Sequence, residues 1–443
     1  MGYGSASYNY LNNPNPALTG RIRLRQGYGG HEGSMNTLTK SNVRLFASSK
    51  SWIEGEALRQ LYAVAKFEGM RLAAGFPDLH PGKGSPVGAA FVTEGLIYPY
   101  VIGGDIGCGM GLFKTDLVQR DIKLNRWTEL RFDLEHPWEG DVQEVLAASE
   151  LESTEFDQSL GTLGGGNHFA ELQMVDEVLD SRAFKLFGLG KQQLVVLVHS
   201  GSRGLGECVL REYVDEHQAR GADVHPPQYA IESGSNSERA GAAFTGSTSR
   251  YCYGGRAESF AAAAYLQRHD LAVRWAKVNR RLLAQRFVRQ LGAEAGLLWD
   301  GCHNSITSHE LEGETVWVHR KGPVAAESEA VVIPGSRGSL SYLVKPLGDG
   351  KSHAWSLAHG AGRKWARSEA RQRMRERFGM HQLTQTPLGG RVICEERDLL
   401  YEEAPAAYKD IEDVIQELVD AGLVSVIATF RPLLTYKTRA LRR

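Results

Sequence analysis

The feature that most constrains the fold is a recurring pair: a short apolar run, rich in β-branched residues, followed at once by a loop of Gly, Ser, Asn and His. The run 194–198 leads into His199-Ser200-Gly201, and the run 331–333 leads into Pro334-Gly335-Ser336. Short apolar runs bounded by turn residues are typical of buried strands, and loops at strand ends are where binding and catalytic side chains gather. Helix-like segments are interleaved with these runs in no simple order. The sequence therefore predicts a mixed α/β protein with polar side chains at several strand ends.

Hydrophobic spacing predicts the individual elements. Helices are expected over 47–66, 259–291, 363–378 and 410–421. Ser49 or Ser51 is expected to cap the first of them, and the second is either one long helix or a helix pair. Strands are expected over 87–92, 96–102, 194–198, 316–318, 331–333 and 424–428. Residues 207–255 are expected to form a polar surface excursion, because 233–248 is rich in Gly, Ser, Asn and Thr.

Composition narrows the class of protein. The chain has 443 residues, of which 42% are hydrophobic and 23% charged, as in ordinary globular proteins. No apolar run reaches membrane-spanning length, so we expect no membrane partner. The five cysteines are scattered and odd in number, which favours a reducing, cytoplasmic location over a disulfide framework. Residues 1–34 are rich in Gly, Asn, Ser and Tyr without periodicity, and are expected to be a disordered N-terminal extension.

The charge balance bears on nucleic-acid binding. A net charge of −1 excludes a global basic signature, so any contact with nucleic acid requires a local patch. The segment 363–378 is one such patch, since it has seven Arg or Lys residues against two Glu.

The loop 103–109, Gly-Gly-Asp-Ile-Gly-Cys-Gly, places the Asp105 carboxylate three residues before the Cys108 thiol. Its four glycines let the backbone approach a ligand closely. A carboxylate and a thiol in such a turn suit a metal ion better than a core. The alternative for this loop alone is a helix-capping Asp beside a small buried thiol.

Further polar loops add imidazoles and anion-binding backbone. The run Gly164-Gly165-Gly166 before Asn167 and His168 resembles a nest of N–H groups that cradles an anion. Taken singly, each loop also fits an ordinary turn, cap or solvated segment. The others are 199–204, 302–304, 319–322, 334–341 and 359–363. His359, followed directly by Gly360, is expected to lie at the start of the basic helix, where a helix N-terminus attracts anions.

Together these loops supply a carboxylate, a thiol and several imidazoles, and the paired-cysteine and His-Glu-x-x-His spacings of structural and protease zinc sites are absent from the sequence. Mixed oxygen, nitrogen and sulfur donors beside anion-binding loops favour a catalytic divalent metal that acts on phosphoryl groups. Zinc, manganese and iron all fit the ligand types.

The loops match one family. In this order, GGDIGCG, GGGNHFAE, HSGSRG, HN, HRKG, PGSRGS and AHGAGR resemble the motifs of the RtcB family of RNA-splicing ligases, as does DLHPGKGSPVG at 78–88. The resemblance covers roughly 50–440. It implies a single catalytic domain over 35–443, with packed β-sheets surrounded by helices and a central metal cleft.

The resemblance also implies an activity. The family joins an RNA 3′-phosphate or 2′,3′-cyclic phosphate to a 5′-hydroxyl, using GTP and manganese. Asp105, Cys108 and His168 resemble the ligands of one Mn²⁺, and Cys108, His199 and His303 those of a second, with the thiolate bridging. His359 resembles the histidine that becomes guanylylated. The residues that resemble the GTP pocket are Asn167, His168, Phe169, Ala170, Glu171, His303, Asn304, Pro334, Gly335, Ser336, Arg337, Ser341, His359, Gly360, Ala361, Gly362, Tyr408 and Lys437. Arg203 and Arg320 are candidate contacts to RNA phosphate or to the substrate termini.

The chain departs from the family pattern at Lys83, where an aromatic is usual, at Arg337, where Met is frequent, and in its tail, 438–443. These features resemble the bacterial subgroup encoded beside peptide release factor H, which implies a link to the ribosome and to repair of its damaged RNA. Two other functions fit the loops: a metal-dependent RNA-end phosphodiesterase or phosphatase without ligation, and a non-enzymatic RNA- or ribosome-binding metalloprotein.

Overall fold

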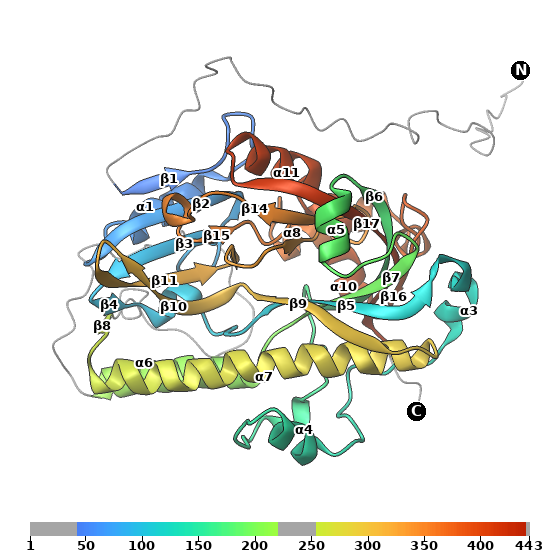
Figure 1. Ribbon diagram of the computed structural model, residues 1–443, viewed down its shortest axis with the longest axis horizontal. Helices are drawn as coiled ribbons and strands as arrows, with labels where there is room; N and C mark the ends of the chain where they lie inside the picture. Colours follow the sequence, from blue (N-terminus) through green and yellow to red (C-terminus); the bar gives the residue numbers. More distant parts are fainter. Residues whose placement is uncertain (1–41, 220–253, 440–443) are drawn as a thin grey trace, which may run out of the picture. The chain divides into compact units, whose positions relative to one another are not determined.

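The computed structural model describes residues 42–219 and 254–439 (Figure 1). The prediction of a disordered extension over 1–34 lies outside the described residues. The described residues belong to one compact unit, Met35–Arg443.

A large, mainly antiparallel sheet carries most of the candidate site. Its strand order is β13-β14-β17-β6-β7-β5-β9, with β16 parallel to β17 at one side. The edge strands β13 and β9 approach each other, so the sheet curls almost into a barrel. The bounds are β5 (Gly109–Val118), β6 (Phe169–Val178), β7 (Gln193–Ser200), β9 (Ala295–Cys302), β13 (Val331–Ile333), β14 (Ser341–Pro346), β16 (Arg391–Cys394) and β17 (Val424–Thr438).

A second sheet of five strands has the order β1-β2-β3-β11-β10. The chain passes from β9 of the large sheet into β10 of this one through a single residue, His303. The bounds are β1 (Val43–Leu45), β2 (Met70–His80), β3 (Val87–Glu94), β10 (Asn304–Leu311) and β11 (Glu314–Lys321). Two further sheets have two strands each: β4 (Leu96–Ile97) pairs with β8 (Gly255–Arg256), and β12 (Val324–Ala325) pairs with β15 (Ser356–Leu357).

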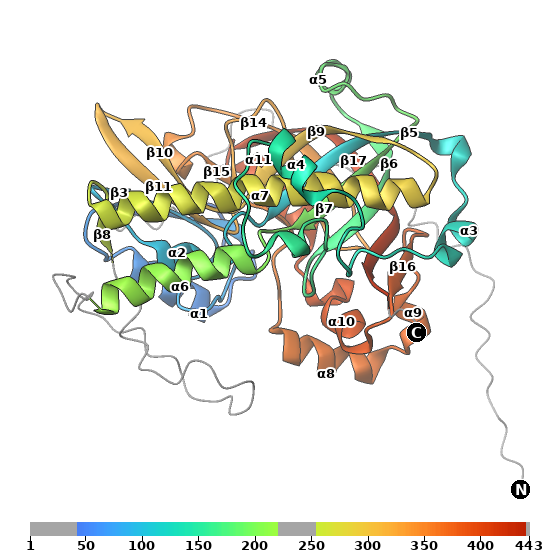
Figure 2. The ribbon, with the colours of Figure 1, turned by 90° about the horizontal axis from the view of Figure 1, so that it is seen from below.

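Helices cover the sheets, which confirms the predicted mixed α/β class. The longest, α7, lies along β5, β7 and β9, with α6 beside it (Figures 1 and 2). Figure 2 shows α8, α9 and α10 gathered near β16. The bounds are α1 (Gly55–Val64), α2 (Pro99–Ile102), α3 (Leu124–Glu129), α4 (Val142–Ala148), α5 (Ser181–Leu186), α6 (Gly204–Ala219), α7 (Phe260–Gln290), α8 (Arg367–Arg377), α9 (Met380–Leu383), α10 (Arg397–Glu402) and α11 (Ile411–Asp420).

Several predicted elements are confirmed. The strands expected over 87–92, 194–198, 316–318 and 331–333 form, and 259–291 is one continuous helix, capped by the Ser259 side chain, which accepts a hydrogen bond from the Ala262 N–H. Asp410 caps α11 in the same way through the Glu412 N–H. The strand expected over 424–428 forms as part of the longer β17.

Other predictions were wrong. The run 96–102 is not one strand, because Pro99 occupies the first turn of the short helix α2. The first helix begins at Gly55 instead of 47, and the expected cap Ser51 instead donates a hydrogen bond to the Glu417 carboxylate. The polar excursion expected from 207 is helix α6 as far as Ala219, and 220–253 lie outside the described residues. The basic helix α8 begins only at Arg367, so His359 does not lie at its start.

Candidate metal centre and adjoining pocket

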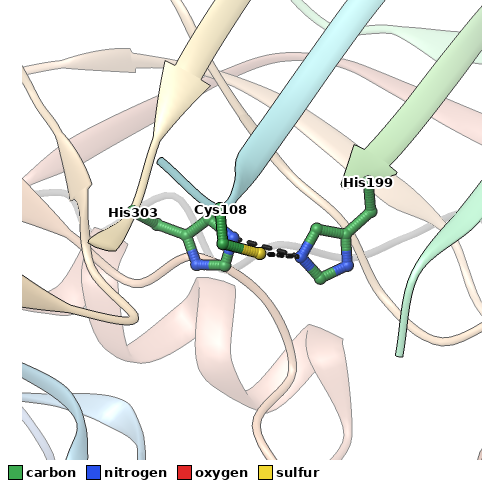
Figure 3. A group of neighbouring side chains, drawn as sticks. All are labelled: Cys108, His199 and His303. Atoms are coloured by element: carbon green, nitrogen blue, oxygen red, sulfur yellow. Dashed lines mark hydrogen bonds between the residues drawn. The ribbon is translucent and has the colours of Figure 1, made fainter. Parts of the chain in front are cut away.

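Four adjacent strands of the large sheet bring the predicted ligands together. In the order β6-β7-β5-β9, Phe169 pairs with His199, and Gly109 pairs with both Ser200 and Cys302. The residues flanking these pairs include His168, before β6, Cys108, before β5, and His303, after β9. Ligands that are far apart in the sequence therefore meet at one edge of the sheet. Figure 3 shows Cys108, His199 and His303 directed toward one another.

The donor atoms lie at close range. Cys108 Sγ is 3.2 Å from His199 Nε2 and 3.5 Å from His168 Nε2, and His199 Nε2 is 3.1 Å from His303 Nε2. His168 Nε2 is 4.0 Å from Asp105 Oδ2. Two groups result, Cys108–His199–His303 and Asp105–Cys108–His168, and the donor atoms within each lie within 4.8 Å of one another. Ligands that bind one ion at about 2.0–2.3 Å are themselves roughly 3 Å apart, so these spacings fit a metal.

In His168 and His199, a hydrogen bond of ring nitrogen Nδ1 explains why Nε2 is available to a metal. His168 Nδ1 lies 2.9 Å from the Leu163 carbonyl, and His199 Nδ1 lies 3.2 Å from the Asn167 carbonyl. Each Nδ1 must donate its proton to that carbonyl, which leaves a lone pair on Nε2. Lone pairs of His168 and His199 therefore face the Cys108 sulfur, an arrangement that a cation stabilises.

Burial keeps the imidazoles neutral. His199 and His303 are nearly inaccessible to solvent, and burial holds the pKa of both far below the usual value. Neutral imidazole is the form that binds a metal. Burial also raises the pKa of the Cys108 thiol well above its usual value, Asp105 raises it further, and Arg280 opposes the shift. A coordinated divalent ion reverses this effect and deprotonates the thiol. The donor set therefore fits a metal ion, with Cys108 common to both groups.

His359 lies against this cluster. Its ring stacks on that of His303, with 4.8 Å between ring centroids and 19° between planes. Its Nδ1 lies 2.6 Å from Oδ2 of Asp78, a residue of β2 with no solvent exposure, and its backbone N–H donates to the same oxygen at 3.2 Å. A carboxylate that binds Nδ1 fixes the ring orientation and the tautomer, so the Nε2 lone pair is free to react.

The surroundings of Asp78 keep it ionised. Burial alone would raise its pKa, but His359 and then Lys409 lower it below the usual value. Lys409 Nζ donates to the carbonyls of Pro77 and Leu79, on either side of Asp78, at 2.8 Å each. Gly362 has a φ of +71°, and a Cβ there would lie 2.3 Å from the Asp78 carbonyl oxygen, so the loop after His359 can approach β2 only with glycine at this place.

A cavity adjoins the cluster and collects most of the residues predicted for the nucleotide. Ala170 and Ser341 are not among its walls: Ala170 packs in the apolar core, and Ser341 Oγ accepts a hydrogen bond from Gln173 Nε2. His168 belongs to the metal groups instead of the cavity wall. The predicted residues that line the cavity are Asp105, Cys108, Asn167, Phe169, Glu171, His199, His303, Asn304, Pro334, Gly335, Ser336, Arg337, His359, Gly360, Ala361, Gly362, Tyr408 and Lys437.

One part of the cavity contains a network of paired charges around Glu403. Its carboxylate lies 2.9 Å from Arg363 Nη1 and 3.6 Å from Lys437 Nζ, and it accepts a hydrogen bond from the Tyr408 hydroxyl. Burial favours a raised pKa, but Lys437 and Arg363 outweigh it and bring the pKa of Glu403 down to about 2. Burial also raises the pKa of Glu171 to about 6, although Thr435 and Gln173 donate hydrogen bonds to it.

The two arginines predicted to contact RNA differ in position. Arg320 is fully buried, and its guanidinium donates to Ser356 Oγ, Thr307 Oγ1 and the Trp355 carbonyl. That prediction was wrong for Arg320, because the side chain does not reach the surface. Arg203 is partly exposed, its Nε donates to Thr162 Oγ1, and its guanidinium packs against Gly164. Burial lowers the pKa of Arg203, and Asp105 opposes that shift.

Sequence reasoning assigned no role to Asp78 or Glu403. The signal for Asp78 was present, because it opens the segment 78–88 that resembles a family motif. Glu403 had no comparable signal, since it is one of two adjacent glutamates before a helical turn. Arg363 and Arg367 also line the cavity. The sequence placed Arg363 in the 359–363 loop and the basic helix, and Arg367 only in the basic helix.

Comparison with known proteins identifies the family to which the chain belongs. The family model described as tRNA-splicing ligase RtcB matches residues 60–157 and 138–438. The chain belongs to the RtcB family. The RNA-splicing ligase RtcB2 of Escherichia coli is 39% identical over 395 residues, which covers 89% of this chain and 95% of that protein. The tRNA-splicing ligases RtcB of Thermococcus kodakarensis and Aeropyrum pernix are 28% and 27% identical, each over 86% of this chain and 90% and 91% of their own length.

The RtcB match includes both candidate metal groups, His359, Asp78 and the cavity walls. Among the residues that the structure describes, no helix is long and apolar enough to cross a membrane. Four of the five cysteines lie in the described part of the chain, and all four are free thiols.

Proposed function

We propose that this protein is an RNA ligase that joins 3′-phosphate or 2′,3′-cyclic phosphate ends to 5′-hydroxyl ends, using GTP, Mn²⁺ and a covalent His359–GMP intermediate. The observation that carries the proposal is His359 itself. Its Nδ1 is held by a buried carboxylate, and its ring stacks on His303, one of the candidate metal ligands. A histidine with a fixed tautomer beside a metal cluster is organised for nucleophilic attack on a phosphoryl group.

In the first step, the Nε2 lone pair of His359 attacks the α-phosphorus of GTP. The new bond is N–P, the bond that breaks joins the α-phosphorus to the bridging oxygen, and pyrophosphate leaves. Asp78 holds the proton on Nδ1 and stabilises the positive charge that develops on the ring. Asp105, Cys108 and His168 would hold one Mn²⁺, and Cys108, His199 and His303 a second. When bound, these ions supply positive charge that favours attack on an anionic phosphate.

In the second step, an oxygen of the RNA 3′-phosphate attacks the phosphorus of the His359 adduct. The N–P bond breaks and the ring returns to its neutral form. The RNA 5′-hydroxyl then attacks the activated 3′-phosphate, a phosphodiester forms and GMP leaves. A 2′,3′-cyclic phosphate must first be hydrolysed to the 3′-phosphate. Arg203, beside the Gly164–Gly166 loop, is proposed to bind RNA phosphate near these ends.

The guanine base is proposed to occupy the part of the cavity lined by Phe169, Glu171, Tyr408 and Lys437. Aromatic side chains stack on bases. A guanine presents acceptors at O6 and N7 and a donor amine, so one cationic and one carboxylate side chain complement it. Pro334, Gly335 and Ser336 follow strand β13 and line the same cavity.

The same proposal includes the wider role. We propose that residues 35–443 form one catalytic domain and that the protein works in the cytoplasm on broken RNA. The likeness to a subgroup encoded beside peptide release factor H supports damaged ribosomal RNA as the substrate. Joining of a cleaved ribosomal RNA with defined ends, in comparison with a cleaved tRNA, tests this part.

The decisive experiment is incubation with Mn²⁺ and GTP labelled at the α-phosphate. The proposal expects a covalent, acid-labile adduct on the parent and none on His359→Ala, with metal content unchanged. Asn304→Ala, also at the cavity wall, is the matched variant that keeps the nucleophile. An adduct on His359→Ala would overturn the assignment of the nucleophile. Hydrolysis of RNA ends without joining and without need for GTP would favour the phosphodiesterase instead.

A further inference from the structure

Two consecutive side chains of helix α7, Asn279 and Arg280, are fully buried and reach into the loops that carry the candidate metal ligands. Helix α7 contributes none of those ligands. Burying an amide and a guanidinium on the inner face of a helix costs folding free energy unless every hydrogen-bonding group has a partner. What they bind therefore indicates why the fold holds them there.

Arg280 joins three of the ligand-bearing segments. Its Nη1 donates to the Gly107 carbonyl at 2.7 Å and to the Ser200 carbonyl at 2.8 Å. Gly107 precedes Cys108, and Ser200 follows His199. Its Nε and Nη2 donate to the two carboxylate oxygens of Asp300, at 2.7 Å each. Asp300 lies in β9, the strand that leads to His303. One guanidinium thus joins two backbone carbonyls and one carboxylate, on the segments that carry three of the ligands.

Asn279 joins the remaining segment. Its Oδ1 accepts from the Gly161 N–H at 2.7 Å, and its Nδ2 lies within 3.3 Å of the Thr162 carbonyl, Ser200 Oγ and the Gly201 carbonyl. The next carbonyl along, that of Leu163, accepts from both Ser200 Oγ and His168 Nδ1. Asn279 therefore fixes the loop that orients His168 against the loop that follows His199.

We infer that Asn279 and Arg280 are positioning residues for the metal centre: they hold the four ligand-bearing segments in register. This rests on the proposed function only through the assignment of the metal ligands. Neither residue lines the cavity or supplies a ligand atom to the groups described. Their effect on the reaction is therefore indirect, through the geometry of the donor atoms.

The test measures binding of Co²⁺ alone, without GTP or RNA, to the full chain. Arg280→Lys keeps the charge but cannot form the fork with Asp300 and the two carbonyls. The double variant Arg280→Met/Asp300→Asn removes both charges together, so no bare carboxylate is left in the interior. Arg281→Met is the matched control, because Arg281 is the next residue on the same helix and its exposed guanidinium binds Ser149 Oγ.

We expect Co²⁺ affinity to fall by about 10–100-fold in both Arg280 variants, a range typical for groups that support metal ligands, and to stay at the parent value in Arg281→Met. The thiolate-to-cobalt absorption should also change in the Arg280 variants. Parent affinity and an unchanged spectrum in a folded Arg280→Lys would overturn the inference. If the double variant fails to fold, Arg280→Lys alone decides. A parent protein that binds Co²⁺ but forms no GMP adduct would count against the proposed function and leave this inference standing.

Discussion

The two ends of the cavity handle charge in opposite ways. Around Glu403, burial is offset by paired charge: the carboxylate is bound by Arg363, Lys437 and the Tyr408 hydroxyl, and its pKa is about 2. Around Cys108, burial instead shifts the histidine pKa values down and the thiol pKa up, toward the uncharged forms. The first region holds an ionised carboxylate paired with cations, whereas the second presents neutral donor atoms that face one another.

This contrast indicates which of the two regions favours a bound metal ion. Where a buried carboxylate is already paired with cationic side chains, a largely uncharged base can bind without an added counter-ion. A cluster of neutral donors gains most from a divalent ion, which also converts the thiol to thiolate. His359 adjoins the Cys108 region, with its ring on His303 and its Nδ1 on Asp78, and it lines the same cavity as Glu403. The first three predictions below perturb one of these regions or His359. The last perturbs an exposed ion pair, for comparison.

The largest effect is expected for Cys108→Ala. The Cys108 sulfur belongs to both candidate groups, so its loss should reduce metal content at both sites and bring GMP-adduct formation down to background. Asp105→Ala should chiefly disturb one site. Elemental analysis of the purified variants measures this, with the buried Cys208→Ala as the control thiol. Metal content in Cys108→Ala equal to that of the parent would refute a shared sulfur.

A somewhat smaller loss is expected for Asp78→Asn. The amide keeps the shape but no longer selects the tautomer of His359, and a comparable change costs about 10⁴ in rate in serine proteases. We expect the rate of GMP-adduct formation to fall by about 10³–10⁴, with metal content unchanged. Single-turnover labelling measures this rate. A variant that also loses metal would mean that Asp78 supports the cluster and not the nucleophile alone.

The sequence was most informative about the ligands. Asp105, Cys108, His168, His199 and His303 could be named because each lies in a loop after or before a strand-like run, and the order of these loops resembles one family. Strand order is what makes them neighbours, and that order depends on pairing between distant segments that periodicity does not encode. The strand expected over 96–102 failed because one proline favoured a helical turn.

The partners of those residues were much harder to predict. Asp78 and His359 are 281 positions apart, and their contact depends on the packing of the His359 loop against β2. Likewise, nothing in the helix 259–291 marked Asn279 and Arg280, since a polar residue in a long helix is usually solvated. For Arg320 the prediction was wrong in the opposite direction. The segment was interpreted as an exposed basic turn, but the Arg320 side chain is fully buried.

A moderate effect is expected for Glu403→Gln, in stability. Because the pKa of Glu403 falls from its usual 4.5 to about 2 on folding, its ionisation stabilises the folded state above pH 4.5. That stabilisation is lost as the pH falls through 2. The shift corresponds to about 3 kcal/mol. Urea unfolding at pH 7 should therefore separate variant from parent by roughly that amount, and at pH 3 by about half. Glu376→Gln, on the exposed face of α8, is the control. A difference independent of pH would show that lost packing, not charge, is responsible.

The smallest effect is expected for an exposed ion pair on helix α8, outside both regions. Glu369 and Arg373 form an ion pair at 2.7 Å, yet 45% and 46% of their side-chain surfaces remain exposed. Water and salt screen such a pair, and helical pairs at this spacing contribute about 0.3–0.5 kcal/mol. Glu369→Gln should therefore change the free energy of unfolding by no more than that, and the change should vanish at high salt. If Glu369→Gln lost as much stability as Glu403→Gln, solvent exposure would not account for any difference between the two carboxylates. If the small value holds, the distinction between Glu403 and Glu369 lies in burial, since both carboxylates face arginine at under 3 Å.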